Sequence, residues 1–130
     1  MKAYIAVTDR DWYDHLRRMN PAPVEVNFWK PSGGMGFQAL TLGQPLIFKL
    51  HYPENAIVGA GFFGHFSRLP TSLAWDAFGE CNGALTLSQM RVRIEKYRKT
   101  PPSRDDYEIG CILLEEPFFL DEIDWISAPD

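Results

Sequence analysis

Short stretches of alternating apolar and polar residues run through the chain, and this period-two pattern is typical of half-buried β-strands. The pattern, together with continuous apolar runs, predicts strands over residues 2–7, 24–30, 45–52, 56–66 and 107–120, with another short one over 122–126. The third and fourth stretches are separated by the turn sequence Pro53-Glu54-Asn55 and therefore predict a β-hairpin. Glycines within residues 56–66 indicate a bend, a bulge or a close backbone approach.

Two other stretches have the 3.6-residue period of helices. In the first, Trp12, Leu16 and Met19 share one face, and Thr8 followed by Asp11 predicts the N-terminus. The second covers residues 86–99, and residues 67–85 before it predict a loop with one helical turn. Five or six strands with two or three helices predict an α+β domain around a curved or barrel-like sheet.

The helix predicted over residues 86–99 has a strongly basic exposed face. Its capping box is formed by Thr86 and Gln89, and its apolar stripe consists of Leu87, Met90, Ile94 and Tyr97. The opposite face carries five basic residues, Arg91, Arg93, Lys96, Arg98 and Lys99, against the single acid Glu95. This face is either simply solvated or tracks the phosphates of a nucleic acid.

The chain has 130 residues, of which 45% are hydrophobic and 23% charged, which is ordinary for a single globular domain. This composition excludes a disordered tail, a collagen-like repeat and a coiled coil. The sequence contains neither a long apolar span nor a secretion signal, so we expect a cytoplasmic protein with no membrane partner. Cys81 and Cys111 lie 30 residues apart and outside any metal-binding pattern. We therefore expect both to be reduced thiols, as is usual for cysteines in the cytoplasm.

Charge is divided unevenly along the chain, which has a net charge of −4. Residues 105–130 contain nine of the 17 acidic residues and neither lysine nor arginine. Residues 1–104 therefore carry all 13 basic residues against eight acids. Residues 1–104 can therefore form a positive face that binds a nucleic acid, although the chain as a whole is acidic.

Sequence signatures of catalysis are absent: there is no nucleophile elbow, no phosphate-binding loop, no zinc-protease motif and no dinucleotide fingerprint. His15, His51 and His65 are far apart and lack the spacing of metal ligands. The glycine-rich residues 33–36 do not join a strand to a helix and are interpreted as a loop. We therefore expect no catalytic residue, no metal and no cofactor.

The position of Trp29 on its predicted strand is unusual. If Val26 and Phe28 face the core, Trp29 points to the other side together with Asn27. On the neighbouring predicted strand, Lys49 and His51 point away from the core in the same way. A large indole among polar side chains is suited to stack on a planar base and to read its edge. Alternatively, Trp29 is covered by residues 67–85 and belongs to a second small core, and Trp75 and Phe78 of that segment are either core or pocket wall.

Three segments resemble the PUA-like superfamily, in particular its EVE and YTH branches. The segment 27–32 is similar to the EVE motif in which an aromatic strand runs into a Lys-Ser-Glu-Pro loop, although Gly33 stands in place of the glutamate. The hairpin of residues 45–63 resembles the central EVE hairpin, and the strand from Ile109 to Leu114 suits the barrel-closing strand. The resemblance implies a PUA-like pseudo-barrel of five to six strands with two to three flanking helices.

Segments 26–34, 48–53, 74–83 and 109–119 also resemble the N-terminal domain of bacterial HNH-type restriction endonucleases. This resemblance implies that residues 1–130 form a single reader domain, followed in a longer protein by an HNH nuclease domain that this chain does not contain. It implies recognition of a modified, flipped base, most readily modified cytosine in DNA, in modification-dependent restriction.

The expected site combines base-binding and phosphate-binding residues. The base-binding candidates are Asn27, Trp29, Ser32, Lys49, His51, Trp75, Phe78 and Asn82, and the phosphate-binding candidates are Lys30, Arg91, Arg93 and Lys96. Three alternatives remain open: an RNA-binding domain of the same fold, a small enzyme of ASCH type with Lys49 as base, and a protein-interaction module that uses the acidic residues 105–130.

Overall fold

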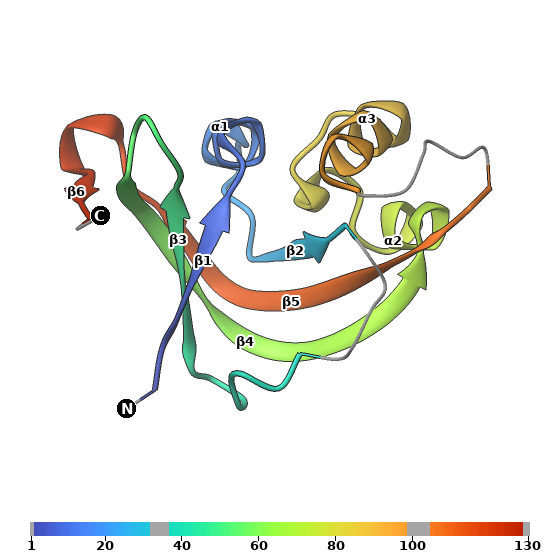
Figure 1. Cartoon of the computed structure of the whole chain (residues 1–130), viewed down its shortest axis with the longest axis horizontal. Coiled ribbons are helices and arrows are strands. Elements are labelled where there is room, and N and C mark those ends of the chain that lie inside the picture. Colours follow the sequence, from blue (N-terminus) through green and yellow to red (C-terminus); the bar gives the residue numbers. More distant parts are fainter. Residues whose placement is uncertain (1, 32–36, 99–104, 129–130) are drawn as a thin grey trace.

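Two long curved strands dominate the computed structural model, which describes residues 2–31, 37–98 and 105–128 (Figure 1). They are β4, Ala56–Pro70, and β5, Glu108–Phe119, which pair antiparallel. The shorter strands are β1, Tyr4–Thr8; β2, Glu25–Lys30; β3, Pro45–Leu50; and β6, Ile126–Ser127. The helices are α1, Arg10–Arg18; α2, Thr71–Phe78; and α3, Leu87–Tyr97, with short 3₁₀ turns η1, Gly79–Asn82, and η2, Glu122–Asp124. The α+β class expected from the sequence is confirmed.

The strands form one mixed sheet in the order β1-β3-β4-β5-β2, with β6 paired to β4. β1 runs parallel to β3, and the other described pairs are antiparallel. The sheet curls, and α1 and α3 lie on the concave side of β4 and β5 (Figure 1). Because β1 and β2 at its two ends are not paired with each other, the curled sheet stays open.

β4 bends where the glycine pattern of the sequence indicates a bend. Its register with β5 shifts after Ala60 and again after Phe63. Gly59 has a φ of +157°, and a Cβ atom there would lie 2.2 Å from the carbonyl oxygen of Phe118. This position therefore requires glycine, and the close backbone approach expected from the sequence is confirmed.

Aromatic rings fill the centre of the curled sheet. On α1, Trp12 and Leu16 are buried, as their helical spacing predicts. The Trp12 ring packs edge-on against Phe28 at 5.4 Å and against Phe48 at 5.1 Å, and Phe48 stacks on Phe119 at 5.4 Å. Much of the 14% aromatic content is thus accounted for by one continuous ring cluster that joins α1 to the sheet.

The second face of β2 is covered, and Trp29 does not point to solvent. Asn27 and Trp29 lie on the face opposite Val26, as the alternation predicts, but their exposed fractions are only 0% and 8%. The indole Nε1 of Trp29 donates to the backbone oxygen of Asn82 at 2.9 Å, and the Asn27 amide donates to the Asn82 side chain at 2.9 Å. The expectation of an outward-facing indole is therefore wrong, and residues 67–85 cover Trp29, as the alternative interpretation of the sequence states.

Residues 67–85 are more regular than the sequence predicts. They contain the end of β4, the whole of α2 and the turn η1 instead of a loop with one helical turn. The side-chain amide of Asn82 donates to the backbone oxygens of Ala74 at 3.1 Å and Gly79 at 2.9 Å. One buried asparagine therefore ties α2, η1 and β2 together through both ends of its amide group, a long-range contact that local periodicity does not reveal.

The helix ends follow the sequence with small shifts. Thr86 caps α3 by accepting from the Gln89 N–H at 3.1 Å, while the Gln89 side chain accepts from Leu85 N–H. At α1 the N-cap is Asp9 and not Thr8, whose hydroxyl instead donates to its own strand. Of the short strand expected over 122–126, only Ile126 pairs with β4, because 122–124 form η2. Within the described ranges, no helix has the length and apolar character needed to cross a membrane.

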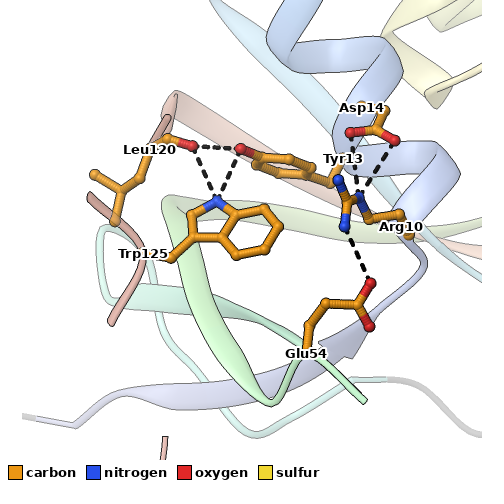
Figure 2. A network of polar contacts seen from close by, with 6 residues as sticks. All are labelled: Arg10, Tyr13, Asp14, Glu54, Leu120 and Trp125. Carbon is orange, nitrogen blue, oxygen red and sulfur yellow. Dashed lines mark hydrogen bonds and ion pairs between the residues drawn. The ribbon is translucent and has the colours of Figure 1, made fainter. Parts of the chain in front are cut away.

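The C-terminal segment is fastened to α1 by a polar cluster that we call the C-terminal clamp, formed by Arg10, Tyr13, Leu120 and Trp125 (Figure 2). The Tyr13 hydroxyl donates to the Leu120 carbonyl and accepts from the Trp125 indole N–H at 3.0 Å. The Arg10 guanidinium lies 5.0 Å from the Trp125 ring centroid and pairs with Glu54 at 3.0 Å. The clamp holds the end of the chain against the first turn of α1.

Candidate functional site

A pocket of about 270 Å³ lies where the curled sheet fails to close. The two end strands of the sheet, β1 and β2, both contribute to it, and the first turn of α1 and the last turn of α3 complete it. Its lining residues are Val7, Thr8, Asp9, Trp12, Phe28, Trp29, Lys30, Pro31, His51 and Tyr97. The open barrel therefore leaves a hollow between its two free edges.

The deep wall of the pocket is aromatic and rigid. Trp12 and Trp29 are 3% and 8% exposed, so only small parts of their rings reach the pocket. Trp12 packs against Phe28, which fixes a second wall ring. Val7 and Tyr97, with exposed fractions of 61% and 38%, lie nearer the solvent. A largely apolar hollow with a few polar groups is the usual form of a small-ligand site.

Asp9 places a carboxylate in this apolar pocket. Its side chain is 9% exposed. Oδ1 accepts from the Tyr97 hydroxyl at 2.5 Å and lies 3.5 Å from the Lys96 ammonium nitrogen. Oδ2 is buried and has no hydrogen-bond partner in the described part of the chain. Leaving a buried acceptor unpaired costs free energy, which a donor that reached this oxygen would recover.

The charges around Asp9 reinforce one another. The Asp9 carboxylate raises the pKa of Lys96. Burial, and after it the hydrogen bond to Asp9, raises the pKa of the Tyr97 hydroxyl. At neutral pH Lys96 is therefore charged and Tyr97 keeps its proton, so both residues hold Asp9 as donors.

Four hydrogen-bond donors of the pocket wall are already engaged. The indole N–H of Trp12 donates to the Asn27 backbone oxygen at 3.2 Å, and that of Trp29 donates to Asn82. The hydroxyl of Thr8 donates to the backbone of β1. With Tyr97 committed to Asp9, these four wall groups offer a ligand no donor, whereas Asp9 offers it an acceptor.

Three basic side chains line the pocket or contact residues that line it. Lys30 is one of the lining residues, and Lys96 forms an ion pair with Asp9, which is another lining residue. Arg98 donates to the backbone oxygen of Pro31, a lining residue, at 3.1 Å, and its guanidinium lies 3.9 Å from the Tyr107 ring centroid. A negative group attached to an occupant of the pocket would meet these cations at the rim.

The structure brings together part of the site expected from the sequence. Trp29, Lys30 and His51 line the pocket, and Lys96 lies beside Asp9. The His51 ring nitrogen Nδ1 is 3.1 Å from the backbone oxygen of Tyr52. Because a carbonyl oxygen only accepts, Nδ1 carries a hydrogen, and Nε2 of a neutral ring is then an acceptor.

The other expected residues lie elsewhere. Asn27 and Asn82 are buried in contact with each other, and Trp75 and Phe78 on α2 pack against the core. Lys49 lies on β3 outside the pocket lining. Two arginines are engaged internally: Arg91 with Asp105 and the Tyr107 ring, and Arg93 with the Gly83 carbonyl. Ser32 falls outside the described residues.

The most informative residues of the pocket escape the sequence analysis. An acid at the start of a helix, such as Asp9 before α1, is fully explained by the helix dipole, and Tyr97 belongs to the apolar stripe expected for residues 86–99. Their hydrogen bond joins residues 88 positions apart. One local signal does exist: Asp9 lies between a strand and a helix, so the sequence places it at an end of the sheet. This signal does not identify Tyr97 as the residue that Asp9 contacts.

Comparisons with known proteins establish the fold and nothing narrower. No family model matches the chain, and no curated protein matches it. A solved ASCH structure from Zymomonas mobilis is 8% identical, with 93% of this chain and 73% of that chain covered and a TM-score of 0.51. A tyrosine-to-phenylalanine variant of that protein is 10% identical, with 95% of this chain and 78% of that chain covered and a TM-score of 0.53. A serine-to-alanine variant is 9% identical, with 92% of this chain and 68% of that chain covered and a TM-score of 0.52. ASCH domains belong to the PUA-like superfamily, and this chain shares the α+β fold of these structures.

Proposed function

We propose that the chain is a nucleic-acid-binding module that accepts one base, flipped out of its strand, in the pocket between β1 and β2. The finer part of the proposal is that this base is a modified cytosine in DNA, read in a restriction context in the cytoplasm, with an HNH nuclease domain as partner. The observation that carries the proposal is an aromatic-walled pocket with Lys30, Lys96 and Arg98 around its mouth.

The dimensions and chemistry of the pocket support this occupant. Its volume of about 270 Å³ lies just below the range of about 300–1,000 Å³ typical of sites for drug-sized ligands, so it suits one small planar ring. Contact between a base and aromatic side chains contributes about 1–3 kcal/mol, which offsets the few kcal/mol lost when a base leaves its stack. The cations at the rim lie where the phosphates attached to an inserted nucleotide would pass.

The proposed contacts differ in part from those expected from the sequence alone. Phe28, Tyr97 and the accessible parts of Trp12 and Trp29 contact the base, with His51 at the mouth. Lys30 and Lys96 contact phosphate, and Arg98 joins them. Arg91 and Arg93 are left out because they donate to Asp105 and Gly83, which do not line the pocket, whereas Arg98 donates to the lining residue Pro31.

The pocket can be tested by blocking its mouth. Val7, 61% exposed, lines the pocket, whereas Ile5, two residues earlier on β1 and 57% exposed, does not. We expect Val7→Trp to weaken binding of a duplex containing one 5-methylcytosine at least tenfold and Ile5→Trp to leave it unchanged. Fluorescence anisotropy at fixed salt measures both affinities.

Unmodified duplex and single-stranded RNA of the same sequence form the other arms of this titration. Tighter binding of the modified duplex supports the finer proposal, and tighter binding of the RNA replaces it with the RNA-binding alternative. No binding of any of the three, or equal effects of Val7→Trp and Ile5→Trp, overturns the pocket as a base-binding site.

A further inference from the structure

The unpartnered oxygen of Asp9 distinguishes between bases that donate and bases that only accept at the same position. Oδ1 is held by Tyr97 and Lys96, so rotation of the carboxylate is restricted and Oδ2 stays the oxygen without a donor on a residue that lines the pocket. The exocyclic amino group of cytosine or adenine donates a hydrogen bond, whereas the equivalent oxygen of uracil or thymine only accepts one.

We propose that Asp9 Oδ2 accepts a hydrogen bond from the exocyclic amino group of the bound base and thereby selects cytosine over uracil or thymine. This inference rests on the proposed function and adds the group that sets base specificity. A 4-oxo base in the pocket would place its oxygen against Asp9 and leave two buried acceptors without a donor. Sites built around a polar partner discriminate strongly against analogues that lack it.

The surroundings of Asp9 favour an amino group on a neutral ring over a cationic ligand. An aromatic pocket with one carboxylate is also the chemistry that binds a methylated ammonium group. Here, however, the carboxylate is already paired with Lys96, and Lys30 and Arg98 lie at the mouth. A cation would meet these positive charges, whereas a base attached to phosphates would be attracted by them.

Two bases that differ only at the relevant edge provide the test. 5-Methylcytosine and thymine have the same ring size and the same methyl group, but one has an amino group where the other has an oxygen. Each is placed at a single unpaired position in the same DNA oligonucleotide, and affinity is measured by fluorescence anisotropy. We expect the wild-type protein to bind the 5-methylcytosine probe at least tenfold more tightly.

Asp9→Asn is the critical variant, and Asp11→Asn is its matched control. The asparagine side chain would keep an oxygen for Tyr97 and turn an amide N–H₂ towards the pocket, so we expect the preference to vanish or to reverse towards thymine. Asp11 is an exposed acid in the same first helical turn and does not line this pocket, so Asp11→Asn should retain the wild-type ratio. Tyr97→Phe, which removes one donor to Oδ1, should reduce the ratio without abolishing binding.

The possible results separate the two proposals. Equal wild-type affinity for both probes, with Val7→Trp still weakening both, overturns the role of Asp9 and leaves the base pocket intact. Binding of neither probe overturns the proposed function and this inference together, as does binding of a trimethyllysine peptide in their place. A wild-type preference that Asp9→Asn preserves also overturns the inference.

Discussion

The first turn of α1 contributes to two polar clusters of opposite character, the C-terminal clamp and the cluster around Asp9. In the clamp, the Tyr13 hydroxyl both donates and accepts, and Trp125 donates to it (Figure 2). Arg10 is paired with Glu54 and lies over the Trp125 ring. In the pocket, by contrast, Asp9 keeps one buried oxygen without a partner among the described residues.

This difference separates a structural cluster from a binding site. Hydrogen bonds that are complete in the folded chain stabilise it and leave nothing for a ligand. A buried acceptor without a donor destabilises the empty protein, and a ligand that supplies the donor would satisfy it. Changes in the clamp should therefore lower the free energy of unfolding, whereas changes at Asp9 should alter binding.

The largest expected loss of stability tests whether Trp29 mainly stabilises the fold, although it lies in the pocket wall. Its ring is 8% exposed and its N–H is bonded to Asn82, so Trp29→Ala should lower the free energy of unfolding by about 3–5 kcal/mol. Urea titration followed by far-UV circular dichroism measures the loss. Leu73→Ala, at a half-exposed position on α2, is the control and should cost far less. An unchanged stability of Trp29→Ala would restore the outward-facing indole expected from the sequence.

The second effect tests the clamp itself. Tyr13→Phe keeps the buried ring but removes the hydroxyl that joins Leu120 and Trp125, and we expect a loss of about 1–3 kcal/mol. The same urea titration provides the number. Tyr4→Phe removes a hydroxyl from a ring that is 41% exposed and should be neutral. Equal stabilities of the two variants would show that the clamp does not stabilise the fold.

Local patterns predict most of this fold because its strands and helices bury one face in a regular period. The helix face of Trp12 and Leu16, the hairpin of β3 and β4 and the capping of α3 by Thr86 all arise from neighbours in sequence. The cover over β2 is different. It depends on the side chain of Asn82, 55 residues from Asn27, and such a contact leaves no periodic signal.

The site is less predictable than the fold for the same reason. Trp29 and His51 are found from alternation, because a strand residue opposite the core must meet either solvent or another layer. Asp9 and Tyr97 are not, because each has an adequate local explanation, as a helix-start acid and as part of an apolar stripe. Their functional character lies in a contact between two helix ends that are distant in sequence.

A smaller change in the free energy of unfolding should appear at alkaline pH, and it concerns the cluster around Asp9. The pKa of Lys96 is raised by Asp9, and the pKa of Tyr97 is raised by burial and by its bond to Asp9. Both folded pKa values lie above the unfolded ones, so the stabilisation is complete below about pH 10 and is lost as pH rises through the folded values. Urea titrations between about pH 9 and 12 should show a decline that is shallower in Tyr97→Phe. An equally steep decline in the variant would exclude this contribution.

The smallest expected effect is the stability change of Asp9→Asn, and it distinguishes the two clusters most directly. Aspartate and asparagine are about equally good at a helix N-cap, and the ion pair with Lys96 is long and solvent-exposed on the lysine side, so its loss costs little. The neutral amide also removes a charge from an apolar wall. We expect a change within about 0.5 kcal/mol in either direction, measured beside Tyr13→Phe. A loss as large as that of Tyr13→Phe would mean that Asp9, like the clamp, stabilises the fold. Its unpartnered oxygen would then result from packing and would not serve to bind a ligand.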